Sequence, residues 1–181
     1  MVNQRADARR NYERILEVAE DVVAEQGTQA SLREVARRAG VGLGTLYRHF
    51  PTRDALLEAL LRQHFDDLAE AARELSAGPP VEALEEWLRR FLAGSTTYRG
   101  LAQLLMTADA SSPLDASCQA MREAAGQLLA RAQEAGHVRS DVDRTDVFAL
   151  VSALSWIAEQ APALADRTEH LFGLVMTAIR G

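Results

Sequence analysis

The sequence predicts an all-α protein of about nine helices, and three observations lead to that prediction. Apolar residues recur at the i, i+3, i+4, i+7 spacing of one helix face in segment after segment. No stretch of the 181 residues alternates apolar and polar side chains as a half-buried strand does. Hydrophobic residues make up 48% of the chain, which is enough to build a core without disulfides or a metal. We expect two domains, residues 1–54 and residues 55–181.

The first helix is expected from Asp7 to Gln26, after a frayed polar arm of residues 1–6. Gly27 is typical of a residue that ends a helix. The apolar stripe of this helix indicates that it packs against its neighbours, and it consists of Ile15, Leu16, Ala19, Val22 and Val23.

The next segment begins with the sequence signature of a short helix and a tight turn. Ser31 and Glu34 have the spacing of a capping box, in which each side chain accepts a hydrogen bond from the other residue's N–H. Gly40 suits the left-handed residue that ends such a helix. Two small helices joined by a Gly-containing turn form a helix-turn-helix, so residues 1–54 are predicted to be a three-helix DNA-binding head.

A second short helix is expected over residues 43–49. Its first position follows Gly42, which has no side-chain hydroxyl to cap the helix. Pro51 cannot extend a helix, and Thr52 can cap the long helix that follows.

The string GVGLGTLYRHFPTRDALLEAL, residues 40–60, resembles the DNA-binding signature of the tetracycline-repressor (TetR) family of transcriptional regulators. The resemblance runs from about Asn11 to Leu60 without a gap. Three helices that merely pack together would not explain why Tyr47, Arg48 and His49 crowd on one small exposed face.

The resemblance implies a role in DNA binding for eight residues. Tyr47 would contact a phosphate or a base, while Leu43 and Thr45 would read bases or thymine methyl groups. Arg33 would reach a guanine. His49 and Arg53 would anchor phosphates, and Arg48 would lie near the DNA backbone, with a merely solvated side chain as the alternative. Gly44 has no side chain and so allows the protein backbone to approach DNA closely.

The net charge of −6 is divided unevenly between the two domains. Residues 1–54 hold nine Arg and eight Asp or Glu, which gives +1, and residues 55–181 hold eleven Arg and eighteen acids, which gives −7. This asymmetry should orient the head toward DNA and the body away from it. Arginines available for phosphates are Arg5, Arg9, Arg10, Arg33, Arg37, Arg38, Arg48 and Arg53.

The body is expected to contain a bundle of further helices. Gly78-Pro79-Pro80 is its clearest break. The predicted helices run from Thr52 to about Ser76, and then over residues 80–98, 101–108, 113–135, 143–160 and 162–179.

The last two predicted helices are apolar on nearly all sides, so each must be buried on two faces. We expect one face to pack on the chain's own body and the other on a second copy, as a two-fold homodimer. The alternative is a monomer with a deep core. The resemblance implies the same dimer, which would place two recognition helices on a pseudopalindrome. The candidate interface residues are Ala149, Ser152, Ala153, Trp156, Phe172, Val175, Met176 and Ile179.

The body is also where a ligand pocket is expected, since such pockets are largely apolar with a few polar groups. Each candidate could equally be plain core. The candidates are His64, Phe65, Leu68, Trp87, Phe91, Tyr98, Leu101, Leu105, Met121, Leu128 and Trp156. No metal site is expected, because the histidines are scattered without a second ligand at helical spacing, and no cofactor is expected either.

The sequence is compatible with three classes of function. The first, and the favoured one, is a cytoplasmic repressor released from its DNA operator when a small apolar or amphipathic effector enters the body. The second is an enzyme, which is not expected because the chain has no Gly-rich phosphate loop and no nucleophile–base spacing. The third is a ligand-independent or activating regulator whose body binds another protein. A polar N-terminus and apolar runs too short to span a bilayer favour a soluble protein.

Overall fold

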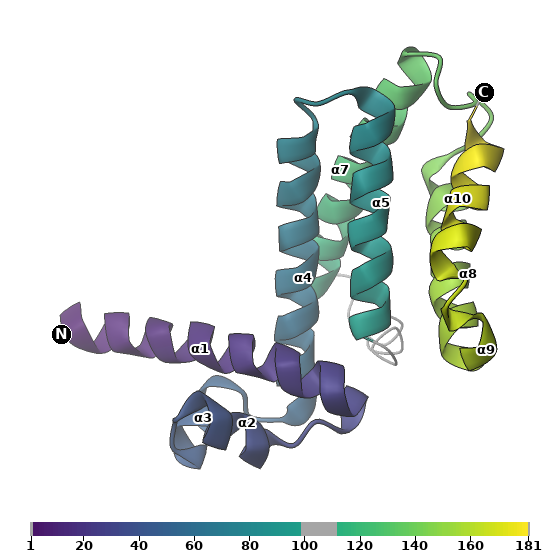
Figure 1. Ribbon diagram of the computed structural model, residues 1–181. Helices are drawn as coiled ribbons and strands as arrows, with labels where there is room; N and C mark the ends of the chain where they lie inside the picture. Colours follow the sequence, from purple (N-terminus) through teal and green to yellow (C-terminus); the bar gives the residue numbers. More distant parts are fainter. Residues whose placement is uncertain (1, 99–111, 181) are drawn as a thin grey trace. The chain divides into compact units, whose positions relative to one another are not determined.

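The computed structural model describes residues 2–98 and 112–180, and within these ranges the chain is helical and contains no strand, which confirms the predicted fold class. Nine α-helices and one 3-10 turn are present in the described part (Figure 1). The short helix predicted over residues 101–108 lies outside it. The chain divides into two compact units, Met1–Gln63 with Thr97–Leu114, and His64–Thr96 with Asp115–Gly181.

The first unit begins with α1 (Val2–Gln26), which starts five residues before the predicted Asp7. The frayed arm was therefore a wrong prediction. No Gly or Pro interrupts residues 2–6, and Gln, Arg and Ala are good helix formers, so the helix already begins at Val2. The predicted apolar stripe of α1 is buried, and Gly27 ends the helix at φ +62 before η1 (Gly27–Gln29).

Helix α2 (Leu32–Ala39) is capped by Ser31, whose hydroxyl accepts from the Glu34 N–H at 3.4 Å. The second half of the predicted capping box is not made. The N–H of Ser31 donates to Oε1 of Gln26 at 3.2 Å, because the Glu34 carboxylate accepts from the guanidinium groups of Arg37 and Arg38 instead.

Gly40 ends α2 in the left-handed conformation, at φ +67 and ψ +29. The N–H of Val41 donates back to the carbonyl of Ala36 at 3.0 Å, which closes the last turn of α2. Helix α3 (Leu43–His49) follows at once, and Gly42 gives it no side-chain cap, as the missing hydroxyl predicts. Figure 1 shows α2 and α3 lying along one side of α1.

Phe50 leaves α3 in an extended conformation, and the Thr52 hydroxyl accepts from the N–H of Ala55 at 3.0 Å. Thr52 therefore caps α4 (Arg53–Leu75), as predicted. The boundary between the two compact units falls within this continuous helix, after Gln63.

The second unit contains the later half of α4 with α5 (Pro80–Thr97), most of α7 (Pro113–Glu134) and α8 (Arg144–Gln160). Trp87 of α5 is fully buried, and its Nε1–H donates to the carbonyl of Leu68 at 2.8 Å. Its ring stacks on Phe91 and meets Phe148 of α8 edge-on, so aromatic packing joins α5 to α8 while the hydrogen bond joins α5 to α4.

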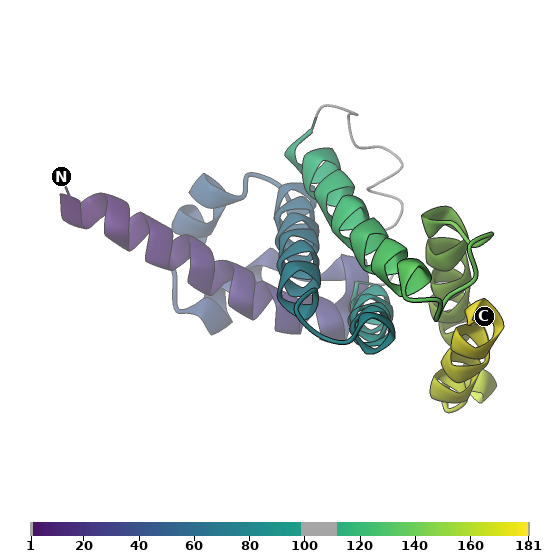
Figure 2. The ribbon, with the colours of Figure 1, turned by 90° about the horizontal axis from the view of Figure 1, so that it is seen from above.

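The helix predicted over residues 162–179 is broken into α9 (Pro162–Ala165) and α10 (Thr168–Ile179). The hydroxyl of Thr168 donates to the carbonyl of Ala165 at 2.8 Å, and such local bonds compete with a continuous helix. Helix α10 lies beside α8 (Figure 2). Arg89 of α5 stacks on the ring of Phe172 at 4.6 Å and pairs with Glu169, which fastens α10 to α5.

We expect Gly40→Ala to loosen α2 and α3, because a left-handed residue with a Cβ costs roughly 1–2 kcal/mol. Amide hydrogen exchange in these two helices should accelerate accordingly. Gly44→Ala is the matched control, since Gly44 lies within α3 without a positive φ and a Cβ there would meet no atom within 4 Å. Alanine at position 44 should slow exchange. Equal effects of the two substitutions would contradict this account of the turn.

Candidate nucleic-acid interface

Helix α3 has one buried anchor and an exposed ridge. Leu46 has no exposed surface, and it holds the helix against α1 and α2. On the opposite side Tyr47 is 45% exposed, and Gly44 and Arg48 are exposed beside it. Leu43 and Thr45 are half-buried at the edge of this ridge. A short helix with an exposed aromatic residue and a glycine on one face can approach a groove of double-stranded DNA closely.

Arg48 lies along its own helix. Its Nε donates to the carbonyl of Gly44 at 3.2 Å, and its Nη2 donates to Oγ1 of Thr45 at 3.1 Å. These exposed bonds are easily exchanged for a phosphate, because each contributes little in water.

Arg33 and Arg53 differ in how they are held. Arg33 is exposed on α2, and in the described part of the chain its side chain forms no hydrogen bond or ion pair. Arg53 is exposed at the first position of α4. Its Nη1 donates a hydrogen bond to Oε1 of Gln29 at 3.3 Å, which orients the guanidinium. The Arg53 guanidinium thus sits beside the positive end of the α4 dipole, a favourable place for a phosphate.

Four of the arginines predicted for phosphates are paired with acids. Arg38 binds Glu25 of α1 through two bonds of 2.8 and 2.7 Å and also binds Glu34. Arg37 shares Glu34. Together the two arginines lower the pKa of Glu34 to about 2.

The other two paired arginines lie on α1. Arg9 pairs with Glu13 at 2.7 Å, and Arg10 pairs with Asp7. Of Arg5 the structure describes only the backbone, in α1. Of the predicted arginines whose side chains the structure describes, those without an acidic partner are Arg33, Arg48 and Arg53.

His49 was predicted as a phosphate anchor, and it is half-buried at the end of α3. Its imidazole meets the ring of Tyr12 edge-on, with centroids 6.0 Å apart, while Tyr12 stacks on Phe50 at 5.1 Å. Sequence reasoning missed Tyr12. The signal was present, because Tyr12 lies three and four residues before Ile15 and Leu16 and so extends the same apolar stripe.

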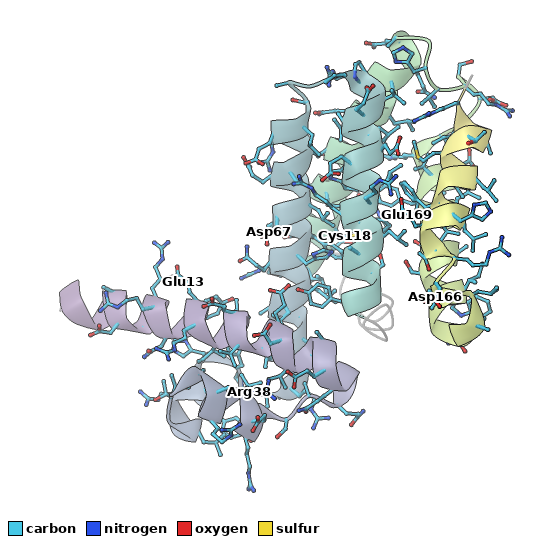
Figure 3. All side chains as sticks on the ribbon, viewed as in Figure 1. Glu13, Arg38, Asp67, Cys118, Asp166 and Glu169 are labelled. Atoms are coloured by element: carbon cyan, nitrogen blue, oxygen red, sulfur yellow. The ribbon has the colours of Figure 1, made fainter. Side chains whose placement is uncertain are left out.

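A hollow of about 590 Å³ lies on α1 and α2, and Glu13 and Arg38 beside it are labelled in Figure 3. Its walls carry both signs of charge and only one apolar side chain. None of the predicted pocket residues lines it; the lining is Arg10, Glu13, Arg14, Glu17, Val18, Asp21 and Arg38.

Most of the predicted ligand-pocket residues are core residues. Phe65, Leu68, Trp87, Met121 and Leu128 are buried in the second unit, where His64 and Phe91 are half-buried. Tyr98 is buried in the first unit, and its hydroxyl donates to Glu20 at 3.0 Å. Leu101 and Leu105 lie outside the described residues. Trp156 is 63% exposed, which places it on the surface of α8.

His64 packs directly against Gly94 of α5. A Cβ added to Gly94 would overlap the imidazole, so only glycine leaves room for this ring. Burial lowers the pKa of His64, and the nearby Asp67 carboxylate offsets part of that effect. His64 is thus a polar group set against an apolar, aromatic part of the body.

The described residues contain no group of three metal-ligating side chains. Burial raises the pKa of the Cys118 thiol, which disfavours a reactive thiolate. No helix of the described part is long and apolar enough to cross a membrane.

The predicted dimer residues fall into two groups. Ala149, Ser152, Ala153 and Trp156 are exposed along α8, and Val175 is half-buried on α10. Phe172, Met176 and Ile179 are instead buried inside the chain itself, because α10 is apolar all round and this face packs on the body. The outward face of α10 carries Leu174, which is 54% exposed, with Gly173, Thr177 and Ala178.

Comparison with known proteins covers both units. Residues 15–60 match the family described as bacterial regulatory proteins, tetR family. Residues 79–181 match the family described as transcriptional regulator SbtR-like, C-terminal domain.

Solved structures and curated relatives agree with these matches. The chain is 39% identical to TetR transcriptional regulator SCO0520 from Streptomyces coelicolor, covering 93% of this chain and 98% of that one, with a TM-score of 0.75. It is 35% identical to a TetR transcription regulatory protein from Mycobacterium vanbaalenii, covering 98% and 99%, with a TM-score of 0.74. It is 27% identical over 154 residues to the HTH-type transcriptional repressor KstR2 of Mycobacterium tuberculosis, covering 80% and 77%.

The environment of His64 predicts a pH dependence of stability. Its folded pKa is lowered from the ordinary 6.5, so below pH 6.5 the unfolded chain binds more protons at this position than the folded chain. This contribution to stability is present above pH 6.5 and is lost as the pH falls toward the folded pKa. Urea unfolding at pH 7.5 and 5.5 should show a smaller loss for His64→Gln than for the wild type. The control His170→Gln, at an exposed position, should lose as much unfolding free energy between pH 7.5 and 5.5 as the wild type. If His64→Gln lost as much as the wild type, this account would be contradicted.

Proposed function

This chain belongs to the tetR family of bacterial regulatory proteins, and we propose that it is a repressor that a small apolar or amphipathic ligand releases from a pseudopalindromic operator. It is a DNA-binding transcriptional regulator, as its family is. The proposal adds the sign of regulation, the release by a ligand and the two-fold form of the operator. The repressor named among its relatives, KstR2, supports the sign.

The exposed ridge of α3 is the observation that carries the proposal. Tyr47 is 45% exposed although it is a large aromatic residue, and its neighbours Gly44 and Arg48 are also exposed. A monomeric fold gains nothing from that exposure, whereas a recognition helix needs it to enter the major groove. Arg33, free of partners in the described part, extends the same surface on α2.

A second exposed apolar surface supports a homodimer. It is formed by α8 and α10, where Leu150, Trp156 and Leu174 are 41%, 63% and 54% exposed. Ala149, Ser152, Ala153 and Gly173 lie among them and are small enough for another copy's helices to approach closely. Large apolar side chains on neighbouring helices mark an interface in a protein of this size. Two copies joined by this surface would present two recognition helices to one pseudopalindrome.

The ligand is proposed to enter the second unit. Phe91 and Phe148, both half-buried, lie edge to face at 5.1 Å, and the half-buried His64 offers a polar group in the same unit. An apolar pocket with one or a few polar groups selects apolar or amphipathic molecules. Helix α4 starts in the first unit, directly after the recognition helix, and carries His64 in the second unit. A ligand that favours one position of α4 would therefore change DNA affinity.

The alternative is a regulator that needs no ligand, or that activates transcription through a body that binds another protein. Mass spectrometry of small molecules extracted from the purified protein, followed by DNA titration with and without them, distinguishes the two. An extracted molecule that weakens DNA binding supports the ligand-released repressor.

The direct test of the proposed function is a selection of fragments from the source genome, including the DNA upstream of the protein's own gene, at two salt concentrations. We expect selective, salt-sensitive capture of a pseudopalindrome. Capture of all sequences alike by a protein shown to be dimeric would contradict the proposed operator.

Arg33 and Arg53 should affect this binding in different ways. Arg33→Ala should relax specificity at one base position, at a cost of roughly 1–3 kcal/mol for the preferred base. Arg53→Ala should weaken binding to all sequences alike and reduce the slope of log affinity against log salt by about one. Titrations of both variants against an operator library check this. The same selectivity profile for both would refute the division of roles.

Trp156→Asp should separate the dimer, because it places a charge in the middle of the proposed apolar interface. Analytical ultracentrifugation should find a monomer that keeps its helical circular dichroism spectrum and binds the full operator far more weakly. Ala77→Asp, at an exposed position between α4 and α5, is the matched charge control and should remain dimeric. A dimeric Trp156→Asp variant would rule out this surface.

A further inference from the structure

Three rings meet at the end of the recognition helix. Tyr12 of α1 stacks on Phe50 with centroids 5.1 Å apart and an interplanar angle of 29°, and it meets His49 edge-on at 6.0 Å. Phe50 is 2% exposed, whereas His49 and Tyr12 are half-buried. Phe50 is therefore the buried base of this cluster, and the three rings form a triangle, since the His49 and Phe50 centroids lie 6.3 Å apart.

The phenol of Tyr12 has a second connection, to α4. Nη2 of Arg62 donates to the Tyr12 hydroxyl oxygen at 3.1 Å, which joins residues 50 positions apart in the sequence. In the described part of the chain this is the one hydrogen bond of the Arg62 side chain, and no acid pairs with it. The bond orients the Tyr12 ring. A hydroxyl group does not neutralise a guanidinium, so Arg62 keeps its positive charge.

His49 has few other restraints. It is the last residue of α3, and Phe50 after it is already extended, with φ −132 and ψ 90. Among the described residues its imidazole forms no hydrogen bond or ion pair; the contacts that hold it are those with the Tyr12 and Phe50 rings. Ring packing of this kind contributes about 0.5–1.5 kcal/mol beyond burial, enough to favour one orientation.

We infer that Tyr12 is a positioning residue for DNA binding: its ring holds the His49 imidazole toward the DNA backbone, and its hydroxyl ties that arrangement to Arg62 of α4. The inference rests on the proposed function, since it assumes that His49 contacts a phosphate. It gives α4 a physical connection to a DNA contact at the far end of the recognition helix. A change in α4 that breaks the Arg62 bond would release the Tyr12 ring and, with it, His49.

The test is a double-mutant cycle in DNA affinity, made with the full-length protein and the captured operator. Tyr12→Phe keeps the ring and removes the acceptor for Arg62, and Tyr12→Leu removes the ring. If Tyr12 acts through His49, each substitution weakens binding in the wild type but has no further effect in a His49→Ala background. We expect about a fivefold loss for Tyr12→Phe, which is the factor one hydrogen bond supplies, and a larger loss for Tyr12→Leu.

The salt dependence gives a second readout that a purely structural role would not change. Tyr12→Leu and His49→Ala should give the same slope of log affinity against log salt, because both remove the same contact with the DNA backbone. A cycle of Tyr12→Phe with Arg33→Ala should be additive, because Arg33 is held independently of this cluster. Tyr12→Phe tests the inference even if the leucine variant does not fold.

Additive losses for Tyr12→Phe and His49→Ala, or an unchanged affinity of Tyr12→Phe, would overturn the inference while leaving the proposed function intact. Failure of the wild type to bind any operator specifically would overturn the proposed function, and the inference with it. The control that separates the two cases is Tyr47→Ala. If the wild type binds the operator and Tyr47→Ala does not, the proposed function holds whatever the result for Tyr12.

Discussion

The turn at Gly40 is the constraint on which the DNA-facing surface depends. A left-handed residue at φ +67 closes α2 and sends the chain directly into α3, so the angle between the two helices is fixed by backbone conformation. Leu46, fully buried, then fixes the rotation of α3 about its axis. Because the angle between α2 and α3 and the rotation of α3 are both fixed, Tyr47 and Arg48 point outward. The missing cap at Gly42 costs α3 some stability when free, and the aromatic cluster at its other end restrains it there.

The arginines of the head fall into two groups, those paired with acids and those without an acidic partner. The Arg38 guanidinium bridges Glu25 of α1 and Glu34 of α2, so it joins these two helices. Such exposed pairs contribute little each, but they offset the charges of Arg37 and Arg38 and leave Arg33, Arg48 and Arg53 without an acidic partner in the described part of the chain. A near-neutral head can therefore still present a positive ridge. In the body, large apolar side chains of α8 and α10 are exposed, and we propose that a second copy of the chain covers them.

Local signals in the sequence were sufficient for the fold. Thr52 capping α4, Gly40 in a left-handed turn and the missing hydroxyl at Gly42 all depend on neighbours in the chain. Two failures were local, the start of α1 at Val2 and the break between α9 and α10, and the others required three-dimensional placement. The capping-box partner of Ser31 is lost because Arg37 and Arg38 reach Glu34 first. Periodicity alone gives no way to choose the inner face of α10, since that helix is apolar all round; Phe172 proved to face inward. Tyr12 gained its role only where α1, α3 and α4 meet.

The measurement that tests the account most directly is the dependence of affinity on the spacing of the two operator half-sites. If two copies joined along α8 and α10 present their α3 helices about one helical turn apart, inserting five base pairs at the operator's centre turns one half-site to the opposite side of the duplex. Affinity should then fall to that of a single half-site. Affinity that is unchanged by the insertion would contradict a two-fold dimer that reads DNA with both recognition helices at once.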